Sequence, residues 1–173
     1  MKTLKTAVFI CFLFIASCAA DKGAAVKERI DPKKLRSYLE DKLYDIGKLI
    51  MDDETELTEA DTIERAKEVV NTIKEHISES ENIINEYAEK SDDLSYMEYI
   101  KTVECTYTSL TASYAYMTAV LDNEDDIGRK EMEDLIYKMR ENAVKIFMRD
   151  MDICINQGKE EAEEEMNENA ADT

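Results

Sequence analysis

Few residues in this chain are suited to catalysis. His76 is the single histidine in the sequence. A Ser-His-Asp or Cys-His relay needs a nucleophile brought to the histidine by folding, and no motif marks one. A carboxylate di-iron site needs Glu-x-x-His on two helices, whereas Ile73 stands three residues before His76. We therefore predict a non-enzymatic protein without catalytic residues, metal or cofactor, and interpret His76 as a helix-surface or flanking residue.

An acidic segment superficially matches a calcium-binding EF-hand loop. Asp122 to Gly128, followed by Glu133, places side-chain oxygens at positions one, three, five and twelve of such a loop. The turn requires glycine at position six, but Ile127 stands there and Gly128 comes one residue later. We interpret the segment as a connection between two helices.

The first 17 residues have the features of a signal peptide. Lys2 and Lys5 supply positive charge, and an uninterrupted apolar run extends from Ala7 to Ile15. This run is too short to cross a bilayer, and no later segment offers the roughly 18 strongly apolar residues that a membrane helix needs. The sequence therefore predicts an exported protein with a soluble mature domain.

The leader ends in Ile15-Ala16-Ser17-Cys18, which resembles the lipobox of bacterial lipoproteins: an aliphatic residue, two small residues and a cysteine. The resemblance implies that Cys18 is lipidated and becomes the new N-terminus, so that the membrane is reached only through this lipid anchor. Residues 18–30 would then form a tether. The alternative is ordinary cleavage after Ala20, which would release a freely secreted protein.

Two cysteines, Cys105 and Cys154, remain in the mature domain beyond Cys18. Two thiols in an exported protein usually pair. If their helices form a hairpin about residue 125, however, Cys105 lies level with residue 145, roughly 13 Å from the level of Cys154. A disulfide then requires the last helix to start later, near Asp134, or its end to fold back. The alternatives are a disulfide and two separately buried thiols.

The elements that position these residues are predicted to be helices. The sequence has only four glycines and one proline, too few for many tight turns or Gly-rich phosphate loops. Glu, Lys, Ala, Met and Ile dominate, and these residues favour helix over strand. The length of 173 residues fits one domain.

The helix boundaries follow from capping signals. A first helix is predicted to open at Asp31-Pro32 and to end at an acidic loop near Asp52 to Glu54. A second is predicted to begin at Thr58 to Asp61, which resembles a capping box, and to run to about Lys90. A third follows Ser91 to Asp93.

The fourth helix is predicted after the loop from Asp122 to Gly128, with an end near Gly158. The prediction is thus an all-α, up-down four-helix bundle with long antiparallel helices over residues 31–158. The remaining residues, 159–173, are Glu-rich and are predicted to form an acidic flexible tail.

Apolar residues at alternating steps of three and four predict the core of this bundle. The predicted seam residues are Leu35, Leu39, Leu43, Ile46 and Ile50; Ile63, Ala66, Val70, Ile73, Ile77, Ser80, Ile84 and Tyr87; Tyr96, Ile100, Val103, Tyr107, Leu110, Tyr114, Met117 and Leu121; and Met132, Leu135, Ile136, Met139, Ala143, Ile146, Phe147 and Ile153. The third helix has no charged residue from Cys105 to Leu121, so we expect it to be buried all round or to line an interface.

The third helix is also rich in tyrosine. Tyr96, Tyr107 and Tyr114 fall on its seam, whereas Tyr99 and Tyr116 lie off it. Tyrosine suits interfaces because the ring is buried while the hydroxyl remains hydrogen-bonded. Tyr99 and Tyr116 are therefore the candidate contact surface.

The charge of the chain narrows the choice of partners. Removal of Lys2 and Lys5 with the leader changes the formal net charge from −18 to −20. Such a surface repels nucleic acid and anionic membranes. The leading hypothesis is a lipid-anchored helical bundle that binds another macromolecule, such as a protein, at the cell envelope or surface. The alternative is a freely secreted carrier or effector that binds an apolar small molecule or a host protein.

Overall fold

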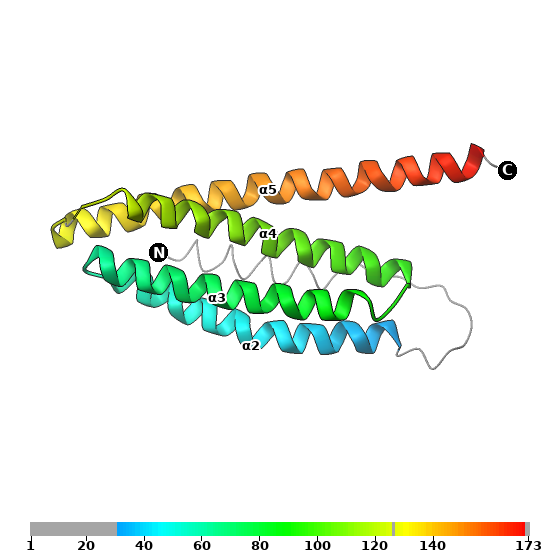
Figure 1. Cartoon of the computed structure of the whole chain (residues 1–173), viewed down its shortest axis with the longest axis horizontal. Helices are drawn as coiled ribbons and strands as arrows, with labels where there is room; N and C mark the ends of the chain where they lie inside the picture. The colour runs from blue at the N-terminus through cyan, green and yellow to red at the C-terminus, as the bar shows by residue number, and fades with distance from the viewer. Residues whose placement is uncertain (1–30, 126, 172–173) are drawn as a thin grey trace.

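The protein folds into the predicted up-down bundle of four helices. The structure is a computed structural model that describes residues 31–125 and 127–171, with side chains up to residue 157. The helices are α2 (Pro32–Glu59), α3 (Ile63–Ala88), α4 (Leu94–Asp122) and α5 (Arg129–Ala171). They run in alternating directions, and each packs closely against the next along the chain (Figure 1). The predicted signal peptide, residues 1–17, and the tether, residues 18–30, lie outside the described residues.

Two of the predicted helix starts are confirmed by their caps. The Asp31 carboxylate accepts a hydrogen bond from the Lys33 N–H at 3.0 Å, and proline occupies the first turn of α2. The Asp93 carboxylate accepts hydrogen bonds from the N–H groups of Ser95 and Tyr96 at 3.1 and 3.2 Å. These side chains satisfy backbone donors that have no partner within the helix.

The predicted boundary between α2 and α3 is wrong. The helix α2 passes through Asp52 to Glu54 without a loop and ends only at Glu59. The N-cap of α3 is Thr62 rather than Thr58, and its hydroxyl accepts a hydrogen bond from the Arg65 N–H at 3.2 Å. The physical reason is that Leu57 continues the buried stripe of α2 and is fully buried, so packing extends the helix beyond its acidic residues.

The predicted seams form one continuous core. Every predicted seam residue of α2 and α3 is buried, except for Tyr87, which packs against the core from its edge. In α4 only Leu110 is partly exposed. Most of the uncharged stretch of α4 is buried between α3 and α5, while Thr108, Ala115 and other small residues remain exposed on a narrow strip.

Buried hydroxyl groups in α4 bond back to their own helix. Thr106 Oγ1 donates to the Thr102 carbonyl at 3.0 Å, and Ser109 Oγ donates to the Cys105 carbonyl at 2.7 Å. Each hydroxyl group thus donates to the carbonyl four residues earlier, and this hydrogen bond offsets the free-energy cost of burying the hydroxyl. Serine and threonine can therefore occupy positions where α5 approaches α4 closely.

The second half of α5 differs from the prediction in two ways. The helix continues through Gly158 to Ala171, because one glycine costs only about 1 kcal/mol and the Glu- and Ala-rich residues that follow favour helix. The predicted end at Gly158 is therefore wrong. Ile153 is 49% exposed rather than buried, and Ile146 and Phe147 are only half-buried, since α5 diverges from α2 towards its C-terminal end (Figure 1).

Candidate functional site

The main polar cluster of the bundle lies where α2, α4 and α5 meet. The Arg140 guanidinium from α5 forms an ion pair with the Glu54 carboxylate from α2, with Nη2 and Oε2 2.6 Å apart. The Tyr114 hydroxyl from α4 donates a hydrogen bond to the other oxygen of the same carboxylate. The Glu54 and Arg140 side chains are only 17% and 19% exposed. One carboxylate thus joins three helices, including the otherwise sparse contact between α2 and α5.

The electrostatics of this cluster follow from its burial. Tyr114 is buried, and removal from water raises its pKa well above the ordinary value of 10.0. The negative charge of Glu54 raises it further, because ionised tyrosine would carry a second negative charge beside the carboxylate. Tyr114 is therefore a neutral hydrogen-bond donor at physiological pH, and the charges of Glu54 and Arg140 compensate each other.

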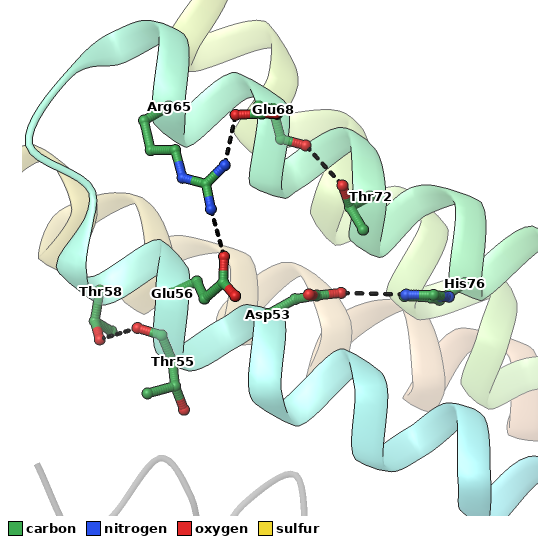
Figure 2. Close-up of polar contacts among 8 residues, drawn as sticks. All are labelled: Asp53, Thr55, Glu56, Thr58, Arg65, Glu68, Thr72 and His76. Carbon is green, nitrogen blue, oxygen red and sulfur yellow. Dashed lines mark hydrogen bonds and ion pairs between the residues drawn. The ribbon is translucent and has the colours of Figure 1, made fainter.

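The histidine joins α3 to α2 beside this cluster, through Asp53, the residue before Glu54. His76 Nε2 lies 3.4 Å from Asp53 Oδ2, and Figure 2 shows the two side chains pointing toward each other. Burial raises the pKa of the Asp53 carboxyl above its ordinary value of 3.8, and the nearby His76 opposes this shift. The prediction of a flanking histidine fits this position, since the His76 side chain is 22% exposed.

A second set of ion pairs joins α2 and α3 nearer the loop that connects these two helices. Arg65 of α3 binds Glu56 of α2 at 2.6 Å and Glu68 of its own helix at 2.5 Å, as Figure 2 shows. All three side chains are substantially exposed. Solvent screens ion pairs that are in contact with water, so these contacts contribute little to the stability of the fold.

The chemistry available to the polar cluster is ion pairing and hydrogen bonding. In the described part of the chain, no group of three or more His, Cys, Asp or Glu side chains is arranged to hold a metal ion. Among the described residues, the buried Arg140 Nε has no hydrogen-bond partner, and the buried Asp53 Oδ2 has the ion-pair contact with His76 but no hydrogen bond. The arrangement suits the fixing of helix positions, and nothing in it activates a nucleophile.

The structure joins Cys105 and Cys154 by a disulfide, with Cα atoms 5.7 Å apart. The expected hairpin about residue 125 is therefore wrong. Such a hairpin would set Ser113 level with Tyr137, but Ser113 Oγ donates to the Ala143 carbonyl at 3.0 Å. The loop after Asp122 runs on past the end of α4 before α5 begins (Figure 1), which brings Cys154 back to the level of Cys105.

The two candidate contact tyrosines lie in different environments. Tyr99 is only 6% exposed, and the Arg36 guanidinium covers its ring at 4.4 Å from the centroid. The prediction of Tyr99 as a contact surface is therefore wrong for the folded chain, because α2 packs over that side of α4. Tyr116 is half-buried, and its hydroxyl accepts a hydrogen bond from Asn142 Nδ2 at 3.1 Å. A contact role for Tyr116 stays a prediction.

The predicted lipidation residue, Cys18, lies outside the described residues. None of the helices in the described part of the chain combines the length and apolar character needed to cross a membrane. No family model, curated protein or solved structure matches this chain.

The polar cluster was missed in the sequence although a signal for it exists. Glu54 falls at the next position of the apolar stripe that contains Ile46, Ile50 and Leu57. Arg140 stands likewise four residues after the buried Ile136. A single charge on the apolar stripe of each of two helices is the pattern of a buried ion pair, because an unpaired charge there would be costly.

Proposed function

We propose that this chain is an exported helical-bundle protein, anchored by lipid on Cys18, that binds a protein partner at the cell envelope or surface and is not an enzyme. The observation that carries the proposal is an apolar stripe on α5, made of Tyr137, Val144, Met148, Met151 and Ile155. The steps between these residues place them along one side of the helix.

The stripe is separate from the buried face of α5. Tyr137 is 71% exposed and Met148 is 53% exposed, while Val144 and Met151 are half-buried. Large exposed apolar residues are common singly, but a row of them on one side of a helix is typical of an interaction surface. Methionine is frequent at such surfaces because its flexible side chain adapts to its partner.

The charge of the chain supports a protein partner over nucleic acid or lipid. The whole sequence has a formal net charge of −18, which opposes contact with phosphate-rich surfaces. The same charge opposes association of two identical copies. A partner with an apolar groove and a basic rim would complement the stripe and the surrounding surface.

Site-specific photo-crosslinking in the native cell tests the proposed surface. A photoreactive residue is placed at Met148, and the matched control places it at Arg149, whose side chain is 65% exposed. Adjacent helical residues project about 100° apart, so only Met148 belongs to the stripe. We expect a discrete adduct from position 148 and little from position 149.

A double variant tests whether the stripe itself is required. Met148→Ser with Ile155→Ser should abolish the adduct formed by a photoreactive residue at Tyr137, whereas Lys145→Ser should preserve it. Circular dichroism spectra of the purified variants must match that of the unmodified chain. Equal adducts from positions 148 and 149, or an adduct that survives the double substitution, would rule out the stripe as the binding surface.

A further inference from the structure

The two halves of α5 are attached to the bundle in different ways. Met132, Ile136, Met139 and Ala143 in the first half are buried, and Arg140 adds the ion pair with Glu54. From residue 144 to residue 157, where the described side chains end, every residue is half-buried or exposed. The first half is therefore anchored by the core, and the second half is not.

The hydrogen bonds and ion pairs of α5 show the same difference between its two halves. Ser113 Oγ donates to the Ala143 carbonyl at 3.0 Å, and Asn142 donates to Tyr116 at 3.1 Å, both near the middle of the bundle. The ion pairs of the second half lie within α5 itself and include Lys145 with Glu141. Among the described residues, no hydrogen bond or ion pair joins residues 144–157 to another helix.

Among the described side chains of residues 144–157, the disulfide is the one strong connection to another helix. Cys154 lies about three turns beyond Ala143 and is bonded to the buried Cys105 of α4. We propose that this disulfide is a redox latch: a dithiol reductant that opens it releases α5 from about Val144 onwards, while the four-helix core stays folded. This inference does not depend on the binding partner proposed above.

The opening reaction is an ordinary thiol–disulfide exchange. Cys154 is half-buried and Cys105 is buried, so the thiolate of the reductant attacks Sγ of Cys154. The bond between the two protein sulfur atoms breaks, and Cys105 leaves as a thiolate that takes up a proton. The second thiol of the reductant then attacks the mixed disulfide and releases Cys154. The protein gains two electrons and two protons, and the reductant becomes a cyclic disulfide.

The core does not need the disulfide to remain assembled. The buried residues of α2, α3 and α4 and of the first half of α5 form one contiguous cluster. The helical hydrogen bonds of residues 144–157 would remain after release, but an exposed, unpacked helix frays because tertiary packing supplies most of its stability. Release is therefore expected to produce faster amide exchange confined to one segment.

Hydrogen exchange measured by mass spectrometry on the full mature chain tests the latch. The oxidised protein is compared with protein treated with dithiothreitol, the dithiol probe. We expect exchange in peptides covering residues 144–157 to accelerate by about tenfold or more, while peptides from α3 change by less than about twofold. The variant with Cys105→Ser and Cys154→Ser should show the fast exchange without dithiothreitol and should not respond to it.

Three results would overturn the proposal. Unchanged exchange in residues 144–157 after reduction would show that packing, not the disulfide, holds the segment. Equal acceleration in all four helices would show that the bond supports the whole fold rather than one segment. A response of the double serine variant to dithiothreitol would show that the effect does not arise from this disulfide.

Discussion

The Glu54 carboxylate shows how a few polar atoms can fix the arrangement of several helices. It accepts from Tyr114 of α4 and pairs with Arg140 of α5 while belonging to α2. A buried ion pair is weak evidence for stability, because desolvation offsets much of the attraction. Removal of one partner is nevertheless costly, since the remaining group stays buried without compensation.

Tyr114→Phe tests the hydrogen bond to Glu54. The substitution keeps the ring but leaves one oxygen of a largely buried carboxylate without its donor. We expect a loss of about 1.5–3 kcal/mol in the free energy of unfolding, measured by urea denaturation at pH 7.

Tyr107→Phe is the matched control. Tyr107 is also buried in α4, but its hydroxyl makes no hydrogen bond to a described residue. Burial raises the pKa of Tyr107, and the nearby Ser80 opposes this shift. Loss of this hydroxyl should change the unfolding free energy by less than about 0.5 kcal/mol or increase it. Equal destabilisation by both substitutions would show that the hydrogen bond to Glu54 contributes nothing specific.

Asp53→Asn tests the pH dependence of the contact between α2 and α3. Burial raises the pKa of Asp53 in the folded state, so the folded protein binds this proton more tightly than the unfolded chain does. This tighter binding of the Asp53 proton stabilises the folded protein below pH 3.8, the ordinary pKa of the group. The stabilisation is lost as the pH rises through the raised pKa of the folded state. We expect the Asn variant to gain stability relative to the unmodified chain as the pH rises from 3 to 7.

The exposed neighbour Asp52 provides the control for this titration. The negative charge of Asp52 is the smallest of the influences that raise the pKa of Asp53, so thermal unfolding of Asp52→Asn should show the same pH-dependent gain as Asp53→Asn but a much smaller one. If the Asp53 variant instead lost stability at pH 7 relative to pH 3, the attraction to His76 would outweigh the desolvation of the carboxylate. The buried carboxylate would then stabilise the fold at neutral pH, contrary to the expectation.

Among the helices, the sequence predicts the buried faces better than it predicts the ends. Periodicity identifies the seams of α2, α3 and α4 because burial selects the side chains on one side of each helix. The end of α2 was misplaced because Asp52 to Glu54 look like a loop, yet two of these carboxylates make contacts between helices. Such contacts depend on the neighbouring helices, which the local sequence does not contain.

The cap of α3 can be tested by comparing two threonines. Thr62→Ala removes the hydroxyl that accepts from the Arg65 N–H and should cost about 1 kcal/mol, measured by urea denaturation. Thr58 lies inside α2, exposed, and donates to the Thr55 carbonyl at 2.6 Å. Thr58→Ala should therefore change stability by less than about 0.5 kcal/mol. A larger loss of stability from Thr58→Ala than from Thr62→Ala would instead support the helix start at Thr58 that the sequence predicts.

The register between α4 and α5, that is, which of their residues lie side by side, is set by the whole chain and not by either helix alone. Six loop residues could turn directly or run past the end of α4, and the sequence does not distinguish these paths. The direct turn separates Cys105 from Cys154, whereas the observed path brings them together. The all-α class follows from composition and periodicity, but the disulfide depends on this choice of path.

The location of the protein depends on the fate of Cys18. We expect mass spectrometry of the N-terminal peptide from the native source to find Cys18 at the new N-terminus with diacylglycerol in thioether linkage. Acyl chains anchor a protein stably, so Cys18→Ala should move it from the membrane fraction to the soluble fraction. Cys11→Ala is the matched control, since Cys11 lies in the apolar run of the leader and should not affect anchoring. A free terminus at Ala19 or Asp21 would contradict the lipid anchor and favour a secreted protein.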